Sequence, residues 1–368
     1  MFKVRAVPNI LLLGSYGRGN IGDDAFFIAA VTLFKESNLY VNSTDDELLP
    51  SIYGTKVETI STTSNREIFK KIIIFIKIDT IAYCGGDLWV ELEGERFPRK
   101  SLYKMLILNI VARIFLKRIN YIGCGVGALK GYSLILAKAS ARLADTISVR
   151  DKHSQDILGK NKTGRISDLS ILLNFPNTRN LKPKKNNKII VGISILYSIP
   201  DAPNNFKLLI ASLAEFIKTL DDNLYEVVLY PMLVSDENKT NDLWASKELK
   251  NTVNQSNVHI FRGRELNTFL ESLNKVDIMI GTRLHANILA TLAGVPCIGI
   301  AYRPKVKNFF QDNGMGKYCL NLEQIDRLSI LFFNSISDYK RMLNTTNTTR
   351  RRMLKDKGKY YMLSEKIV

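Results

Sequence analysis

An arginine and a histidine interrupt an apolar pattern near the centre of "VDIMIGTRLHANILATLAG". The apolar run 278–280 ends at a Gly-Thr step, Arg283 and His285 follow, and an apolar helical pattern then resumes. Arginine binds carboxylate or phosphate through paired hydrogen bonds, and histidine is the side chain best suited to proton transfer near neutral pH. The spacing predicts a strand that turns into a helix, with both side chains directed at one anionic ligand. A buried structural histidine is the alternative.

Further basic residues follow the next apolar run, "PCIGIAY". Arg303 and Lys305 would add positive charge to the same edge of a sheet, because the carboxyl ends of parallel strands meet there. A solvated loop is the alternative for this pair.

Three glycine-rich turns follow apolar runs in the first half of the chain. They are "GSYGRGNIGDDA" (14–25) with Asn20, Gly22 and Asp23, "YCGGDLW" (83–89) with Gly85 and Gly86, and "GCGVGAL" (123–129) with Gly125. Because each glycine adds backbone entropy that folding must overcome, three such turns suggest a ligand bed lined by main-chain amides. The first lacks the spacing of a dinucleotide fingerprint, and its aspartates would repel a phosphate. A tight turn with Asp23 as helix cap is the alternative.

Two more polar steps follow apolar edges in the same half. "SVRD" carries Arg150 next to Asp151, and "ISDLS" carries Asp168. A solvated ion pair is the alternative for Arg150 and Asp151.

Short apolar strands alternate with amphipathic helices along the chain, which is typical of parallel α/β units. Helices are expected near 24–36, 100–116, 133–145, 206–220, 241–254 and 285–293. A Pro/Asn/Lys-rich stretch without apolar period separates two such halves. We therefore expect two doubly wound domains, at 1–176 and 189–340, with a linker at 177–188 and a basic helical tail at 341–368.

Composition limits the functional classes. The 368 residues carry a formal net charge of +17, which attracts anionic substrates, anionic membrane surfaces or nucleic acid. The basic residues lack the aromatic interleaving of a single-strand binder, so no specific nucleic acid is expected. No apolar run is long enough to span a bilayer. The four cysteines are scattered, which indicates neither a zinc site nor a disulfide framework and favours a reduced, cytoplasmic chain.

Taken together and in order, these segments resemble the polysaccharide pyruvyl transferase family. The likeness rests on "GSYGRGNIGDDA", "YCGGDLW", "YIGCGVGAL", "DTISVRDKHSQDIL", "ISDLS" and "IGTRLHANILATLAGVPCIGIAYRPKVKNFF". It implies two Rossmann-like doubly wound domains in a GT-B-like arrangement. It also implies transfer of pyruvate from phosphoenolpyruvate onto a sugar of a cell-surface polysaccharide or its lipid-linked precursor, as a ketal.

That chemistry needs a proton donor, cations for the donor anion and a base for the sugar hydroxyls. His285 is the expected acid/base. Arg283 and Arg150 are expected to hold the donor, and Lys305 and Arg303 are further candidate cations. Asp23 or Asp168 is the expected base for the acceptor. Asn20, Gly22, Gly85, Gly86 and Gly125 are expected to line the substrate site. No metal and no cofactor besides the phosphoenolpyruvate substrate is demanded. The partners expected are phosphoenolpyruvate, a free or lipid-linked glycan and an anionic membrane surface at the inner face of the membrane. A nucleotide-sugar glycosyltransferase of the same architecture, or a non-catalytic glycan- or nucleic-acid-binding protein, are the alternatives.

Overall fold

The structure is a computed structural model that describes residues 7–43, 58–61, 68–91, 99–127, 129–160, 163–175, 188–197, 203–234 and 241–368. The chain forms two compact units. Unit 1 contains Met1–Arg18, Asp23–Leu173 and Met353–Val368, and unit 2 contains Gly19–Gly22 and Asn174–Arg352. The chain therefore passes between the units four times, before and after Gly19–Gly22 and before and after Asn174–Arg352. Apart from Lys188, the predicted linker at 177–188 lies outside the described residues.

Unit 1 is built on a parallel sheet. Its described strands are β1 (Asn9–Leu13), β2 (Asn38–Ser43), β3 (Glu58–Ser61), β4 (Thr80–Cys84), β5 (Asp87–Trp89), β6 (Arg118–Val126), β7 (Thr146–Val149) and β8 (Gly164–Arg165). Their order is β3-β2-β1-β4-β6-β7-β8, and β5 pairs with β6. Chain order reverses between β1 and β4, so ligands of this sheet are expected at the carboxyl ends of those two strands.

Helices cover the sheet of unit 1. They are α1 (Ile21–Leu33), α3 (Ile68–Lys77), α4 (Lys100–Ile114), α5 (Tyr132–Arg142), α6 (Lys152–Leu158) and the 3₁₀ turn η2 (Leu169–Leu172). Alternate strand residues such as Leu11, Ile81 and Tyr121 share one buried cluster with residues of α3, α4 and α5. These three helices therefore lie on one face of the sheet.

A buried amide joins α4 to the sheet beneath it. Asn109 is fully buried, accepts a hydrogen bond from the Tyr83 hydroxyl (2.9 Å), and donates to the Tyr121 oxygen (2.6 Å) and the Ser140 hydroxyl (2.8 Å). The rings of Tyr83 and Tyr121 stack with centroids 4.6 Å apart. Because all three partners are buried, the amide satisfies polar groups that water cannot reach.

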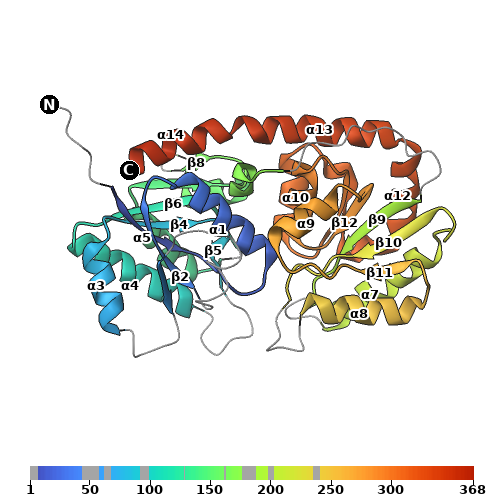
Figure 1. The fold of residues 1–368 in the computed structure, drawn as a ribbon, viewed down its shortest axis with the longest axis horizontal. Helices are drawn as coiled ribbons and strands as arrows, with labels where there is room; N and C mark the ends of the chain where they lie inside the picture. Colours follow the sequence, from blue (N-terminus) through green and yellow to red (C-terminus); the bar gives the residue numbers. More distant parts are fainter. Residues whose placement is uncertain are drawn as a thin grey trace. The chain divides into compact units, whose positions relative to one another are not determined.

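Unit 2 has a second parallel sheet. Its described strands are β9 (Ile189–Ser194), β10 (Tyr225–Leu229), β11 (Val258–Ile260), β12 (Ile278–Gly281), β13 (Cys297–Ala301) and β14 (Cys319–Asn321), in the order β11-β10-β9-β12-β13-β14. Its helices include α7 (Pro203–Lys218), α8 (Asp242–Val253), α9 (Leu266–Leu273), α10 (Leu284–Leu292) and α11 (Pro304–Asp312). Figure 1 shows α7 and α8 on one side of the sheet and α9 and α10 on the other. Chain order reverses between β9 and β12, and Arg283 lies two residues after the end of β12.

The end of unit 2 is helical and leads back into unit 1. It contains the 3₁₀ turns η3 (Gly316–Tyr318) and η4 (Leu322–Arg327), the helix α12 (Leu328–Ser337) and most of α13 (Tyr339–Lys355), and the last helix, α14 (Lys357–Ile367), belongs to unit 1. Within unit 1, buried Tyr360 donates its hydroxyl to the Ser167 carbonyl (2.7 Å), and Arg118 donates to the Ile367 carbonyl (3.1 Å). Asp356 accepts hydrogen bonds from the backbone N–H and hydroxyl of Ser167. The last helix is therefore a packed part of unit 1.

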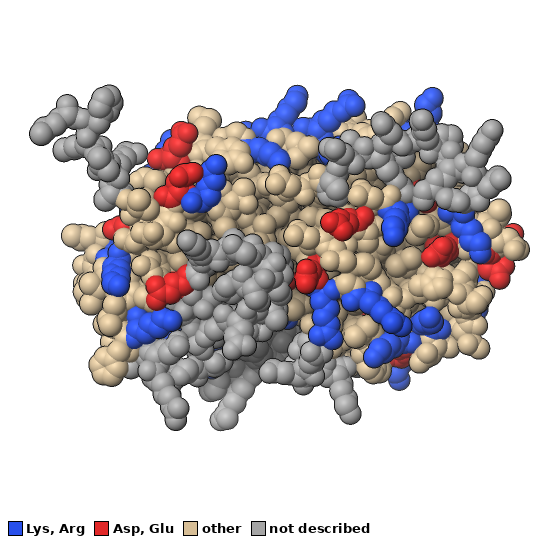
Figure 2. All heavy atoms as spheres, viewed as in Figure 1, with Lys and Arg blue, Asp and Glu red and all other residues tan. Residues whose placement is uncertain are grey.

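Positive charge is spread over the described surface. Figure 2 shows Lys and Arg side chains over much of the visible face, and a group of them follows the edge where α13 runs in Figure 1. None of the helices in the described part of the chain combines the length and apolar character needed to span a membrane.

We predict that Asn109→Leu destabilises the protein by about 2–4 kcal/mol, because it leaves buried tyrosine and serine hydroxyls without partners. Urea unfolding monitored by circular dichroism measures the loss. Lys104→Gln, on an exposed side of the same helix, is the control and should change stability by no more than about 0.5 kcal/mol. Equal stability of the Asn109 variant and the parent would contradict the role given to this amide.

Candidate active site

Arg283 and His285 lie where β12 becomes α10, as their spacing predicts. Arg283 has an extended backbone at the N-cap position, and His285 is in the first turn of α10. Both side chains are half-buried. They therefore occupy the strand end beside the reversal of chain order in the sheet of unit 2.

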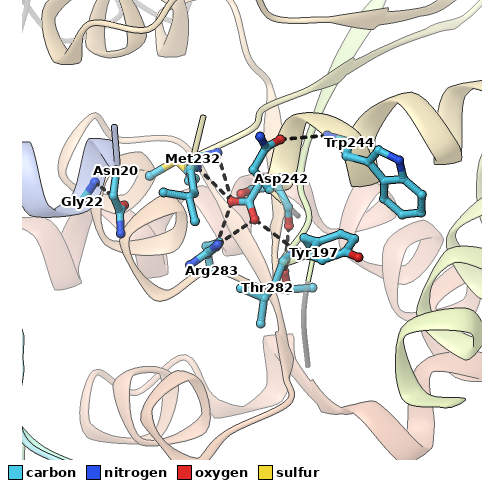
Figure 3. Close-up of polar contacts among 12 residues, drawn as sticks. Asn20, Gly22, Tyr197, Met232, Asp242, Trp244, Thr282 and Arg283 are labelled. Atoms are coloured by element: carbon cyan, nitrogen blue, oxygen red, sulfur yellow. Dashed lines mark hydrogen bonds and ion pairs between the residues drawn. The ribbon is translucent and has the colours of Figure 1, made fainter. Parts of the chain in front are cut away.

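A buried aspartate fixes the guanidinium of Arg283. Arg283 Nε donates to Asp242 Oδ2 (2.9 Å) and its Nη2 donates to Oδ1 (2.6 Å), which is a bidentate pair (Figure 3). The Asp242 side chain is 0% exposed, whereas that of Arg283 is 19% exposed. The pair therefore holds one edge of the guanidinium plane in a fixed position.

Backbone amides complete the surroundings of Asp242. Its carboxylate accepts hydrogen bonds from the N–H groups of Tyr197 (3.1 Å), Met232 (3.3 Å) and Leu233 (3.0 Å). Asp242 is the first residue of α8, after the cap residue Asn241, whose side chain accepts from Trp244 N (3.1 Å). Together with Arg283, these backbone N–H groups provide hydrogen-bond partners for both oxygens of the buried Asp242 carboxylate.

Two further side chains hold the turn between β12 and α10. The Thr282 hydroxyl accepts from Leu196 N (2.7 Å) and donates to the Ser194 carbonyl (3.1 Å), which ties the turn to β9. Asn287 is fully buried and donates to the carbonyls of Gly281 (2.9 Å) and Arg283 (3.0 Å). A β-carbon at Gly281 would lie only 2.6 Å from Asn287 Oδ1, so this close approach requires glycine.

The glycine-rich segment Gly19–Gly22 belongs to unit 2 by its contacts. Asn20 forms an antiparallel bridge with Leu233, and Ile21 N donates to the Met232 carbonyl (2.9 Å). The Asn20 side chain accepts from Gly22 N (3.0 Å), which closes the turn. A β-carbon at Gly22 would lie 2.6 Å from His285 Cγ and overlap the imidazole. Gly22 is therefore the residue that allows the histidine ring to lie against this backbone.

Arg303 and Lys305 lie on either side of Pro304, the first residue of α11. Arg303 is the N-cap residue, Pro304 is the first helical residue, and the Arg303 guanidinium carbon lies 5.9 Å from the centroid of the Tyr302 ring. Arg303 and Lys305 are half-buried. Because β13 is the neighbour of β12, they lie at the same edge of the sheet as Arg283.

Three aromatic side chains pack together near the start of α8. The Tyr197 ring lies 5.1 Å from that of Trp244 and 5.4 Å from that of Phe206, measured between centroids. Trp244 is 40% exposed, and Figure 3 shows it with Tyr197 near the Asp242–Arg283 pair. An exposed aromatic face next to fixed polar groups can stack against a sugar ring.

In unit 1, Arg150 is at the centre of a group of carboxylates. Its side chain is 5% exposed and forms an ion pair with Asp87. Arg150 Nη1 lies 3.7 Å from Asp168 Oδ2, and Nε lies 3.8 Å from Asp151 Oδ2. Burial lowers the pKa of Arg150, but Asp87, Asp168 and Asp151 raise it by more, so the pKa lies above its usual value. A guanidinium that already contacts three carboxylates binds a further anion only by giving one of them up.

The glycine turns of unit 1 allow this packing. A β-carbon at Gly125 would lie 2.5 Å from Asp87 Oδ1 and 2.9 Å from Arg150 Nη2. Gly85 and Gly86 have φ values of 69° and 74°, a region that side-chain-bearing residues avoid. The Gly86 carbonyl accepts from Gly125 N (2.7 Å), so two of the predicted glycine turns contact each other.

Asp168 and Asp23 have different surroundings. Asp168 is 3% exposed, and its Oδ1 accepts from the backbone N–H (3.1 Å) and hydroxyl (2.6 Å) of Ser170, which makes it the cap of η2. Asp23 is half-buried in the first turn of α1. The pKa of Tyr16 is raised well above its usual value, mainly by burial and then by the thiols of Cys84 and Cys124, and Asp23 makes the last contribution. Burial also raises the pKa of the Cys124 thiol to about 12, so this thiol is uncharged at neutral pH.

The structure therefore groups the predicted residues into two sets. Unit 1 contains Arg150, Asp168, Asp23, Gly85, Gly86 and Gly125, and unit 2 contains Arg283, His285, Arg303, Lys305, Asn20 and Gly22. Sequence reasoning missed Asp242 and Asp87 as the partners of the two arginines. Asp242 begins a helix within "NDLWAS" and Asp87 follows a Gly-Gly step, positions at which an aspartate usually caps or turns the chain. No group of residues suited to hold a metal ion occurs in the described part of the chain.

A comparison with protein families identifies the chain. The family model for polysaccharide pyruvyl transferase matches residues 20–304. This chain belongs to the polysaccharide pyruvyl transferase family. The matched region of this pyruvyl transferase family member extends from Asn20 to Pro304, and thus includes the Gly22 turn, the Arg150 cluster and the Arg283–His285 step. No functionally curated protein matches the chain in a sequence search.

Solved structures share its fold at low sequence identity. A glycosyltransferase from Rickettsia africae has a TM-score of 0.62 and 12% identity, over 99% of this chain and 100% of that chain. UDP-GlcNAc 2-epimerase from Neisseria meningitidis, bound to UDP-GlcNAc, has a TM-score of 0.60 and 13% identity, over 97% and 99%. Anabaena HepE in complex with UDP has a TM-score of 0.60 and 13% identity, over 95% and 95%. The expected fold class, two Rossmann-like doubly wound domains of the GT-B type, is confirmed.

We predict that Asp242→Asn destabilises the protein by about 3–5 kcal/mol, because it leaves the Arg283 guanidinium facing a buried neutral group. Denaturant unfolding of Asp242→Asn, Arg283→Gln and the double variant forms a double-mutant cycle. The double variant should lose less stability than the sum of the two single variants, because each single change leaves an unpaired charge. Additive losses would contradict a coupled pair.

Proposed function

We propose that this protein transfers pyruvate from phosphoenolpyruvate onto a sugar of a cell-surface polysaccharide or its lipid-linked precursor, and that the product is a pyruvate ketal. The observation that carries the proposal is the strand end of unit 2, where a guanidinium held by buried Asp242 lies two residues before a half-buried histidine. Family membership supports the reaction class.

The reaction needs four bond changes at the donor. A proton adds to the methylene carbon of phosphoenolpyruvate, and the neighbouring carbon becomes an oxocarbenium-like centre. One sugar hydroxyl attacks this carbon and gives up its proton, and the carbon–oxygen bond to phosphate then breaks. A second hydroxyl attacks the same carbon, gives up its proton and closes the ring. The atoms balance as phosphoenolpyruvate plus a diol giving a ketal plus inorganic phosphate.

His285 is the proton donor in this proposal. Its imidazole lies against the Gly22 backbone, which limits the orientations open to the ring. A side chain that titrates near neutral pH can give a proton to the methylene carbon and take one from an attacking hydroxyl. Positioned acid/base catalysis of this type contributes on the order of 10²–10⁴-fold in rate.

Arg283 holds the donor anion, assisted by Lys305 and Arg303 at the neighbouring strand end. Because Asp242 fixes one edge of the guanidinium, the group is oriented before the substrate arrives, and no reorganisation is needed in the transition state. Losing one such oriented contact costs about 3 kcal/mol of transition-state stabilisation.

Residues of unit 1 complete the proposal. Arg150 is proposed as a second cation for the donor. Its contacts with Asp87, Asp151 and Asp168 offset its positive charge. Asp23 or Asp168 serves as base for the acceptor hydroxyls. Of the two, Asp23 is the more accessible, because Asp168 is 3% exposed. The Gly85-Gly86 and Gly125 turns of unit 1, and Asn20 of unit 2, provide main-chain contacts to the substrates, and no metal or further cofactor is required.

The acceptor is a glycan, free or linked to a lipid. Trp244 and Tyr197 offer it an aromatic surface beside the Arg283–Asp242 pair. A lipid-linked acceptor would bring the protein to the inner face of the membrane, and the basic composition favours an anionic surface there.

A nucleotide-sugar glycosyltransferase is the second candidate, because HepE, a protein of this fold, has been solved with UDP. Thermal shift separates the two: phosphoenolpyruvate should raise the melting temperature of a pyruvyl transferase, and UDP or GDP that of a glycosyltransferase. Stabilisation by a nucleoside diphosphate alone would contradict the proposal.

We predict that His285→Ala lowers phosphoenolpyruvate-dependent phosphate release by 10²-fold or more and leaves phosphoenolpyruvate binding nearly unchanged, because a general acid acts mainly in the transition state. His259→Ala, at an exposed histidine of the same unit, is the matched control and should retain the parent rate. A folded His285→Ala protein with the parent rate would reduce His285 to a structural residue.

We predict that Gly22→Ala also lowers turnover, by tenfold or more, because the new methyl group occupies the space of the His285 ring. Gly358→Ala is the control, since a β-carbon there has no neighbour within 4 Å. Steady-state rates and melting temperatures of both variants make the test. If Gly22→Ala melts and turns over like the parent, the imidazole does not depend on this contact.

A further inference from the structure

Exposed apolar side chains concentrate on one part of unit 1. In the described part of the chain, twelve of the twenty exposed large apolar residues lie on α3, α4 and α5 or directly after α4. They are Phe69, Ile72, Ile73, Ile76, Tyr103, Ile107, Ile110, Ile114, Phe115, Leu116, Tyr132 and Ile135. We call this set the α3–α5 surface. Soluble proteins rarely expose so many apolar side chains together without a binding role.

The exposed residues form stripes with helical spacing. On α3 the stripe is Phe69, Ile72, Ile73 and Ile76, whereas Ile74 on the opposite side is buried in the core. A helix with this pattern is apolar both toward the core and toward the outside. Such a helix contacts an apolar phase on both sides, because an outer face in water is normally polar.

The same pattern continues on α4. Tyr103, Ile107, Ile110 and Ile114 follow one another at three- and four-residue intervals and are exposed. The inward side of α4 supplies Leu102, Met105 and Ala112 to the core.

The stripes are joined into one surface. The rings of Phe75 and Phe115 meet edge to face with centroids 5.7 Å apart, and Lys117 Nζ donates to the Ile76 carbonyl (2.9 Å). The Tyr103 and Tyr132 rings are 6.2 Å apart, which connects α4 to α5. Figure 1 shows α3 and α4 next to each other on unit 1.

Leu116 adds a backbone observation. It is 91% exposed and has φ of 55°, a conformation that a leucine adopts at an energetic cost and that glycine or asparagine usually supplies after a helix. In water, the exposed side chain of this leucine brings no stabilisation that offsets the cost of its backbone conformation. Burial of the side chain in an apolar phase outside the protein supplies that stabilisation.

Charge identifies the partner. The three helices contain eight Lys and Arg residues and no Asp or Glu, although the whole chain has 35 acidic residues. The cations are Lys70, Lys71, Lys77, Lys100, Lys104, Arg113, Lys138 and Arg142. Two copies meeting through this surface would bring like charges together. Lys70 pairs with Glu58 (4.0 Å) and Arg113 with Asp145 (2.9 Å) within unit 1, so the helices remain net positive around the apolar stripes. An anionic lipid surface attracts this positive charge and accepts the apolar side chains.

We propose that the α3–α5 surface docks the protein on the headgroup region of an anionic lipid bilayer, with the two isoleucine stripes inserted and the lysines at the phosphates. Apolar faces of interfacial helices insert about 5–10 Å, which is the depth of one layer of side chains. The inference supplies a location for the membrane contact named under the proposed function. It does not depend on the reaction, because binding to vesicles needs neither donor nor acceptor.

The test uses the full chain and sedimentation with vesicles of phosphatidylcholine containing phosphatidylglycerol. The apolar variant combines Ile72→Gln, Ile76→Gln, Ile107→Gln and Ile114→Gln. Its control, Leu208→Gln with Ile330→Gln, removes exposed apolar side chains of unit 2. The charge variant combines Lys77→Gln, Lys104→Gln and Lys138→Gln. Melting curves establish that each variant is folded.

The parent and the control should bind, and the apolar variant should bind at least tenfold more weakly. The charge variant should lose binding at low salt and show a smaller loss between about 0.1 M and 0.5 M salt, because fewer screened charges remain. Phosphate release with a soluble acceptor should be unchanged in the apolar variant, so failure of docking and failure of the proposed reaction are read separately.

Two outcomes overturn the inference. The first is binding of the apolar variant as tight as that of the parent. The second is a parent protein that does not bind anionic vesicles. This outcome includes a parent that is a dimer and an apolar variant that is a monomer, because the α3–α5 surface would then bind a second copy of the chain.

Discussion

The ion pair between Arg283 and Asp242 is the interaction on which the site of unit 2 depends. Beyond Arg283, the fully buried Asp242 carboxylate has further lone pairs that need hydrogen-bond donors, and three backbone N–H groups supply them. These donors lie in the segments that follow β9 and β10, and the arginine lies in the turn that follows β12. The pair thus joins the segments that follow three neighbouring strands of the sheet to the first residue of α8.

The second constraint is the space for an imidazole. His285 lies against Gly22, and Gly22 is held by the Asn20 side chain and by the pairing of Gly19–Gly22 with residues 232–234. A segment near the start of the chain is therefore part of the surroundings of a histidine far along it. This contact gives a physical reason for the Asn-Ile-Gly step: asparagine closes the turn, and glycine leaves room for the ring.

Many elements were predicted from sequence, but the helices α3 and α9 and the two ion-pair partners were not. Apolar runs such as "TIAYC" and "IMIG" became strands, because buried parallel strands read as continuous apolar runs. The strand-to-helix junction at Arg283 was predicted because a continuous apolar run ends before it and apolar residues recur with helical spacing after it. Asp242 and Asp87 were missed because their partners are distant in sequence, and a single chain contains no signal for such pairs. The last helix was expected as a basic tail, but the burial of Tyr360 against Ser167 depends on tertiary contacts that its charged composition does not reveal.

The central claim is that a proton from the protein is added to the methylene carbon of phosphoenolpyruvate during transfer. Turnover in deuterium oxide, with acceptor present and the product read by mass spectrometry and NMR, tests this most directly. We expect a ketal whose methyl group carries one deuterium, with release of inorganic phosphate. A product without deuterium in the methyl group, or transfer of a sugar with release of a nucleoside diphosphate, would contradict it.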